Sequence, residues 1–280
     1  MPTILITALA MLAFAANSLL GRAALLDDVM DPASFTYLRL ISGAITLVVI
    51  HFLSRGKTNE LINARFIAFS GIALFVYALC FSYAYTNIEA GMGALLLFGA
   101  VQLSMIGFYL VQGNKLFRWE WLGIAVASSG FVLLLLPSAD SPNILASSLM
   151  ILSGVSWAIF TLLGKHASSA RVGITQGFVG AGIIAMLASP WMFTYSSISF
   201  NGVMLALTSG VITSALGYVI WYYAVAKLTV LQASISQLSV PVIALWLGSL
   251  WLGESVSIFL ILVSAMILGG IALVFLTKPR

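Results

Sequence analysis

The stretch that decides the fold covers residues 205–276 and reads LALTSGVITSALGYVIWYYAVAKLTVLQASISQLSVPVIALWLGSLWLGESVSIFLILVSAMILGGIALVFL. It predicts three apolar helices. The first ends in the aromatic run at 221–227, and the second, over 231–251, has Pro241 in its middle. A tight turn at Leu252-Gly253-Glu254 leads to the third helix, over 256–276.

The same layout occurs about 140 residues earlier in the chain. Tyr83-Ala84 closes one helix there, residues 90–111 form the next, Gly113 marks a turn, and a further helix follows over 121–136. Gly130 in this stretch corresponds to Gly270 in the later one. The shared register predicts that the chain is doubled, with a first five-helix unit over 1–137 and a second over 143–280.

The amino-acid composition indicates a protein embedded in a lipid bilayer. Of its 280 residues 61% are apolar and only 7% are charged, whereas soluble domains carry about a quarter charged residues. Such a chain has too little polar surface to cover itself in water. The single Cys80 excludes an internal disulfide and a cysteine-based metal cluster. The net charge of +4 is read as a topological signal and not as a nucleic-acid surface.

Apolar runs recur along the whole chain, and each is long enough to cross a bilayer as a helix. They predict an all-α polytopic membrane protein with ten spans. The first run has no basic residue ahead of it, so we interpret it as an uncleaved span and not as a signal peptide. The ten runs cover about 2–21, 33–53, 66–86, 90–111, 119–136, 144–165, 173–193, 202–226, 231–251 and 256–276.

The placement of Lys and Arg predicts the orientation of these spans. With the N-terminus in the cytoplasm, the outer loops hold only Arg22, and Arg39 lies inside a span. The remaining basic residues all fall inside, and so does the C-terminus. They are Arg55, Lys57, Arg65, Lys115, Arg118, Lys165, Arg171, Lys227, Lys278 and Arg280.

An odd number of spans in each half has a topological consequence. The two repeats then cross the membrane in opposite senses, an arrangement found in alternating-access transporters with a central site near the midplane. Pro241 in one half, and glycines 91, 93 and 99 in the other, are expected to let spans nine and four bend as gates.

These features carry a resemblance to a known family. Ten spans arranged as five plus five, Pro241 in the ninth, and Gly253-Glu254 just before the tenth resemble the EamA branch of the drug/metabolite transporter superfamily. The size and the aromatic interior are most similar to the YddG-type exporters of aromatic and other amino acids. The resemblance implies a bacterial inner-membrane exporter whose fifth and tenth spans lie outside the central cavity.

The first half departs from the family pattern at two positions. Asn114 stands where the pattern has Glu, and Val101 stands where it has Pro. These departures favour a structural role for Glu254 at its turn.

Enzymatic chemistry is not expected. His51 and His166 lie at cytoplasmic span edges in different halves, and no carboxylate shares their depth. Neither a nucleophile–base pair nor a metal site can be built from these residues. We therefore predict no cofactor and no metal. The connections are short, so no obligate protein partner is evident beyond the lipid bilayer.

The distribution of charge bears on energy coupling. All eight acidic residues lie in loops or at span edges, whereas proton-driven transporters usually keep an ionisable group near the midplane. Facilitated transport is therefore expected. Arg39 lies roughly 10 Å inside span two by helical rise. Its side chain either snorkels to the outer interface or lines the pathway, where it would attract a substrate carboxylate.

Polar and aromatic residues within the spans are the candidate substrate contacts. Tyr77 and Phe81 lie on one stripe of the third span, and Tyr218 and Trp221 form a matching face on the eighth. Taken singly, each aromatic is more often a packing residue than a ligand contact. The predicted substrate site comprises Asn17, Tyr77, Phe81, Phe98, Gln102, Trp157, Thr161, Tyr218, Trp221, Tyr222 and Gln237.

A neutral, hydrogen-bonding and aromatic cavity suits a zwitterion, whose charges partly cancel. The expected substrates are aromatic and other neutral amino acids, bound weakly and with broad specificity. The rival function is export of drugs or other small metabolites by the same fold, with or without coupling to protons.

Overall fold

The computed structural model describes residues 3–26, 29–54, 63–113, 115–135, 142–164, 167, 169–192, 198–225, 227–228 and 236–276. Over these ranges the chain is helical, apart from connections and one isolated antiparallel bridge between Met30 and Ile198. Several residues used in the sequence predictions lie outside the described residues. They are Arg55, Lys57, Asn114, Lys165, His166, Lys278, Arg280 and the junction at 137–141.

The helices follow the apolar runs closely. The first half contains α1 Thr3–Leu25, α2 Pro32–Leu53, α3 Ala64–Ala84, α4 Ala90–Val111 and α5 Arg118–Leu135. The second contains α6 Ile144–Gly164, α7 Ala170–Met192, the consecutive segments α8 Phe200–Thr208, η3 Ser209–Leu216 and α9 Gly217–Val225, then α11 Ser239–Leu252 and α12 Ile258–Leu276.

Side-chain caps set several of the helix starts. The carboxylate of Asp31 accepts the backbone N–H of Ser34, and the carbonyl of Asn63 accepts that of Phe66. Ser199 caps α8 in the same way. These short polar side chains satisfy backbone donors that have no partner within their own helix. Pro32 at the first position of α2 needs no such partner.

Seven of the described helical stretches are long and apolar enough to cross a membrane. Large apolar side chains point away from the bundle, with Leu53 80% and Trp191 79% exposed. Both observations fit a multi-pass membrane protein. α5, α11 and α12 are not among the seven, so the ten-span architecture stays a prediction. The seven stretches are Thr3–Leu25, Pro32–Leu53, Ala64–Ala84, Ala90–Val111, Ile144–Gly164, Arg171–Trp191 and Phe200–Trp221.

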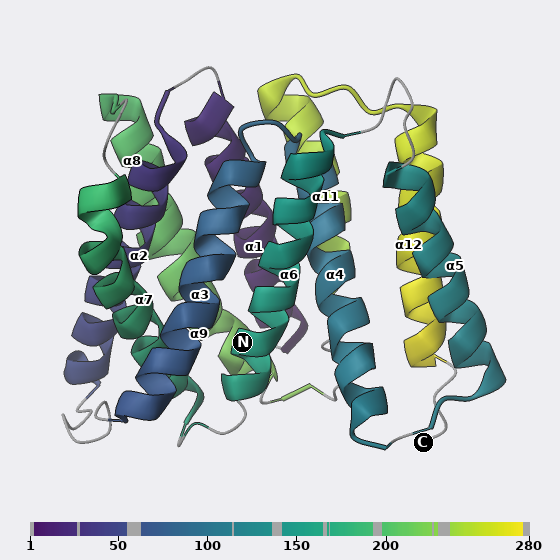
Figure 1. The fold of residues 1–280 in the computed structure, drawn as a ribbon, viewed down its shortest axis with the longest axis horizontal. Helices are drawn as coiled ribbons and strands as arrows, with labels where there is room; N and C mark the ends of the chain where they lie inside the picture. The colour runs from purple at the N-terminus through teal and green to yellow at the C-terminus, as the bar shows by residue number, and fades with distance from the viewer. Residues whose placement is uncertain are drawn as a thin grey trace.

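The two halves of the chain pack through each other. α3 lies against both α6 and α7, and α1 lies against α9 and α11 (Figure 1). α5 and α12, which come from different halves, stand side by side at the right of Figure 1. Gly71 and Gly180 bring α3 and α7 into backbone contact, because a Cβ on Gly71 would lie 2.6 Å from the carbonyl carbon of Gly180.

The position of Pro241 differs from the prediction. α11 begins at Ser239, so Pro241 lies in its first turn and not in the middle of a continuous helix. The helical pattern is interrupted at Leu238. Proline has no N–H to bond the carbonyl four residues earlier, but the first turn of a helix does not require that bond. Residues 229–235 lie outside the described residues, so bending of the ninth span near Pro241 stays a prediction.

Candidate functional site

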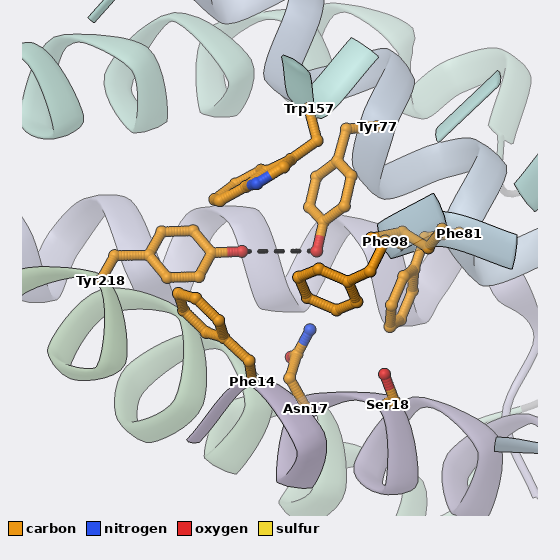
Figure 2. Close-up of a pocket in the computed structure, with 9 residues that line it drawn as sticks. Phe14, Asn17, Ser18, Tyr77, Phe81, Phe98, Trp157 and Tyr218 are labelled. Atoms are coloured by element: carbon orange, nitrogen blue, oxygen red, sulfur yellow. Dashed lines mark hydrogen bonds between the residues drawn. The ribbon is translucent and has the colours of Figure 1, made fainter. Parts of the chain in front are cut away.

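A small cavity lies in the middle of the bundle and is lined by residues of both halves of the chain. Its volume is about 20 Å³, enough for roughly one water molecule. Pockets that hold small ligands are much larger, roughly 300–1,000 Å³, so this cavity is too small for a small-molecule ligand as it stands. The lining residues are Phe14, Asn17, Ser18, Tyr77, Phe81, Leu97, Phe98, Trp157 and Tyr218 (Figure 2).

Aromatic rings form most of the cavity wall. The Trp157 ring centroid lies 4.9 Å from that of Tyr77 and 4.8 Å from that of Tyr218. Phe14 stacks on Phe98 at 6.3 Å and meets the edge of Tyr218 at 5.6 Å. These distances are typical of stabilising aromatic pairs. The wall therefore offers flat apolar surfaces contributed by α1, α3, α4, α6 and α9.

Asn17 is held in the cavity floor by three hydroxyl groups. Its Oδ1 accepts hydrogen bonds from Ser209 Oγ at 2.7 Å, Thr213 Oγ1 at 3.0 Å and Ser214 Oγ at 3.5 Å. All three donors belong to η3, a π-helical segment, and such segments are frequent at functional sites. With its oxygen occupied, Asn17 presents its amide nitrogen to the cavity (Figure 2).

Arg39 lies directly behind the aromatic wall. Its side chain is 1% exposed, and its guanidinium stacks on the rings of Tyr77 and Phe81, at 5.2 and 4.6 Å. Nε donates to Ser214 Oγ at 3.1 Å, and Nη2 donates to the hydroxyl of Tyr77 at 3.0 Å. The head group thus points into the bundle. The interpretation that Arg39 snorkels to the outer interface is wrong, because the ring and hydroxyl contacts hold it inside.

Two tyrosine hydroxyls link the halves beside this guanidinium. Tyr77 OH and Tyr218 OH are 3.4 Å apart, and Nη2 of Arg39 also donates to Tyr218 OH at 3.5 Å. Tyr77 belongs to α3 and Tyr218 to α9. The contact between them is therefore a point where the first half of the chain touches the second (Figure 2).

Some of the predicted site residues meet at this cavity and others do not. Asn17, Tyr77, Phe81, Phe98, Trp157 and Tyr218 line it. Trp221 is buried one layer away, with its ring 5.7 Å from that of Phe14. Three predicted residues do not line the cavity: Gln102, buried on α4; Thr161, which donates to the carbonyl of Trp157; and half-buried Gln237. The side chain of Tyr222 lies outside the described residues.

The predicted set did not include the lining residues Phe14, Ser18 and Leu97, nor Arg39 behind the wall. Phe14 shares a helix face with Asn17 and Ser18, because residues three and four apart lie on the same side. That spacing was a usable signal. Nothing in the sequence indicated which way Arg39 points, since its partners lie on α3 and η3.

A polar contact closes one end of the same bundle. Both carboxylate oxygens of Glu254 accept the backbone N–H of Ala90, at 2.8 and 2.9 Å, and so cap α4 from the other half of the chain. Arg22 lies 3.6 Å from Glu254 and donates to the carbonyls of Tyr85 and Thr86. Glu254 thus has a structural role that extends beyond its own turn.

The carboxylates at this end are weakly hydrated. Burial raises the pKa of Glu254 above its usual value, partly offset by the Ala90 N–H and by Arg22. Burial also raises the pKa of the neighbouring Glu89. Removing water from a carboxylate disfavours its charged form.

Two other features do not point to a chemical site. A lateral cavity of about 480 Å³ between α11 and α12 has an apolar lining that includes Leu245, Trp246 and Leu268. Among the described residues, no group of three or more His, Cys, Asp or Glu could hold a metal ion.

Comparison with known proteins gives consistent matches. The model of the EamA-like transporter family matches residues 1–136 and again 144–276. An uncharacterized protein of Pseudomonas aeruginosa is 44% identical over 99% of this chain and 95% of its own length. An uncharacterized transporter of Archaeoglobus fulgidus is 26% identical over 80% of each chain.

Two further matches are more limited. The uncharacterized inner membrane transporter YedA of Escherichia coli is 28% identical over 37% of this chain and 34% of its own. A protein of known crystal structure, 17% identical, superposes with a TM-score of 0.71 over 99% of both chains. At this level of identity the superposition shows a shared fold only.

Proposed function

This chain belongs to the EamA-like transporter family, and we propose that it is an inner-membrane exporter of amino acids, aromatic and other neutral ones, that works by facilitated alternating access. The observation that carries the proposal is the aromatic cavity enclosed between the two halves. A site that is closed on a volume of about 20 Å³ binds a substrate only when the surrounding helices move apart.

The residues around the cavity support movement of one half against the other. Asn17 and Tyr77 come from the first half, and Trp157 and Tyr218 from the second. In the proposed architecture, two inverted five-span repeats over 1–137 and 143–280 rock about this junction. The interruption of the helix at Leu238 fits the broken helices of such transporters. The proposed orientation keeps both termini in the cytoplasm.

The chemistry of the lining supports the choice of substrate. Phe14, Phe98 and Trp157 offer stacking surfaces for a flat or apolar side chain, and the amide nitrogen of Asn17 offers a hydrogen bond. The buried guanidinium of Arg39 adjoins the wall. It repels a permanent cation, so it disfavours the rival function of cationic drug export.

Counterflow in proteoliposomes that contain only this protein tests the proposal. We expect labelled phenylalanine, tyrosine or tryptophan to exchange without an imposed pH gradient. Trp157→Ala is expected to lower the exchange rate by about tenfold or more, as loss of a buried aromatic contact costs more than 1 kcal/mol. Trp191→Ala is the matched control, because Trp191 is 79% exposed.

Two results would contradict the proposal. Exchange of quaternary ammonium dyes without exchange of amino acids would favour the multidrug function. A strict requirement for a pH gradient would contradict facilitated transport.

A further inference from the structure

We propose that Arg39, together with the hydroxyls of Tyr77 and Tyr218, recognises a carboxylate group on the substrate. The inference rests on the proposed transport function and adds to it the chemical group by which substrates are selected. It makes this buried arginine a specificity-determining residue of the central cavity.

Two nitrogen donors near the cavity have no acceptor among the described contacts. The oxygen of Asn17 already accepts three hydrogen bonds, which leaves its amide nitrogen to donate. Nη1 of Arg39 is buried and has no hydrogen-bond partner. An excess of buried donors is costly unless an acceptor arrives. The group that satisfies several such donors at once is a carboxylate, which accepts through two oxygens.

The tyrosine pair contributes a further donor. Each hydroxyl accepts from Nη2 of Arg39, and the two oxygens lie 3.4 Å from each other. A single hydrogen fills the space between them, so the second hydroxyl hydrogen is available to a ligand. Because both oxygens accept from a cation, this hydroxyl is a strengthened donor.

Among the residues that the structure describes, no carboxylate balances the charge of Arg39. Within the described part of the chain, the ion pair that forms joins Arg22 to Glu254 at the end of the bundle. The contacts of Arg39 are a serine, two tyrosines and the face of a phenylalanine, all uncharged. An ionisable residue at this depth of a membrane protein is costly and usually functional. Ring contacts offset part of the cost but leave the charge uncompensated.

The route to Arg39 passes through the tyrosine pair. Tyr77 and Tyr218 belong to different halves, so the separation of the halves that admits a substrate also parts the two hydroxyls. A carboxylate can then occupy the gap and contact the guanidinium. The side chain of the same substrate lies against Phe14, Phe98 and Trp157. Recognition of the carboxylate and opening of the cavity are thereby linked.

Three analogues that share a phenyl ring and differ in charge test the inference in the unaltered protein. They are phenylalanine, 3-phenylpropionate, which lacks the ammonium, and 2-phenylethylamine, which lacks the carboxylate. We expect the first two to inhibit phenylalanine counterflow, and the amine to be weaker than 3-phenylpropionate by about tenfold or more, since hydrogen bonds to a charged group are worth that much. Equal inhibition by the acid and the amine would overturn the proposal.

Arg39→Gln tests the residue itself. The variant keeps hydrogen-bond donors and loses the charge, so the preference for 3-phenylpropionate over 2-phenylethylamine is expected to disappear. Arg65→Gln, at the exposed start of α3, is the matched control and should keep the preference. A purely structural role for Arg39 would change the amount of folded protein and leave this ratio intact, which would refute the inference. If the variant does not fold, the analogue comparison decides.

Thermal stabilisation by the same ligands separates this inference from the proposed function. Stabilisation by 3-phenylpropionate but not by the amine, in a protein that exchanges no amino acids, refutes the proposed substrate and supports carboxylate recognition. Exchange of amino acids with equal stabilisation by acid and amine refutes carboxylate recognition alone.

Discussion

Single polar side chains decide how the two halves of this protein fit together. Asn17 is 4% exposed and lies in the first helix, yet its hydroxyl partners lie in η3 of the second half. In the lipid interior of a membrane, a polar side chain finds its hydrogen-bond partners within the protein. The same holds for Arg39 and its bond to Ser214. Both residues therefore fix the register of α1 and α2 against η3.

Replacing Asn17 tests this role. Asn17→Ala leaves the Ser209 hydroxyl without its partner, and we expect a loss of about 1–3 kcal/mol in stability, the cost of an unsatisfied buried group. The measurement is the unfolding temperature in detergent. Asn201→Ala is the control, because Asn201 is exposed at the start of α8. If Asn17→Ala and Asn201→Ala unfold at the same temperature, η3 does not depend on the Asn17 amide for its stability.

At the scale of helices, the two halves are also joined where a residue of the second half caps the start of α4 in the first half. The N-cap residue of α4, Glu89, makes no side-chain cap, and Glu254 supplies the cap from beyond α11. Gly253 has a left-handed backbone with φ of 66°, which suits glycine at the end of a helix. Gly248 leaves room for the carboxylate of Glu254, because a Cβ there would collide with it. The Gly253-Glu254 turn therefore joins α11 to α4.

The pKa of Glu254 makes the stability of this contact depend on pH. Because burial raises the pKa in the folded protein, the folded state binds the proton more tightly than the unfolded one. The stability that protonated Glu254 gives the folded protein is fully present below the pKa of the unfolded state, about 4.3. It is lost as pH rises through the raised pKa of the folded state. In the Glu254→Gln variant the side-chain carbonyl can still accept the backbone N–H of Ala90, but the side chain no longer titrates.

We therefore expect the difference in unfolding temperature, wild type minus Glu254→Gln, to fall as pH rises from about 4 to 7. Melting curves of both proteins over that range measure it. Glu89→Gln serves as the companion variant, because the pKa of Glu89 is also raised by burial. A difference that grows with pH would mean that the interaction with Arg22 outweighs the loss of hydration at Glu254.

The molecule is a bundle in which α5 and α12 pair with each other, and none of their described side chains lines the central cavity. The cavity instead lies among α1, α3, α4, α6 and α9. This division separates helices that surround the site from a pair that packs beside them (Figure 1). It matches the expectation, drawn from the family resemblance, that the fifth and tenth spans stand outside.

The proposed topology is open to a direct test. In a Cys80→Ala background, Asn87→Cys and Ser54→Cys place single thiols at exposed positions, after α3 and after α2. We expect a membrane-impermeant maleimide to label Asn87→Cys in intact cells and to label Ser54→Cys only after permeabilisation. The reverse pattern would invert the orientation, and labelling of both from one side would contradict the alternation of spans.

The central site was only partly predictable from the sequence. The aromatic stripe at Tyr77 and Phe81 and the polar Asn17 stood out because such residues are conspicuous in apolar helices. Phe14 was missed although its spacing from Asn17 puts it on the same helix face, and Gln102 was predicted as a ligand contact although it does not line the cavity. Side-chain type indicates what a residue can bind, while the rotation of each helix about its own axis decides whether it faces the cavity.

The sequence by itself determined that this is a membrane protein, and it determined where most of its helices begin and end. Composition rules out a water-covered surface, and Asp31, Asn63 and Ser199 cap their helices locally. Only the tertiary structure decided the partners of Asn17, Arg39 and Glu254. Arg39 and Ser214 are 175 residues apart in the chain. Bonds of that range exist only once the helices have packed, so no local pattern encodes them.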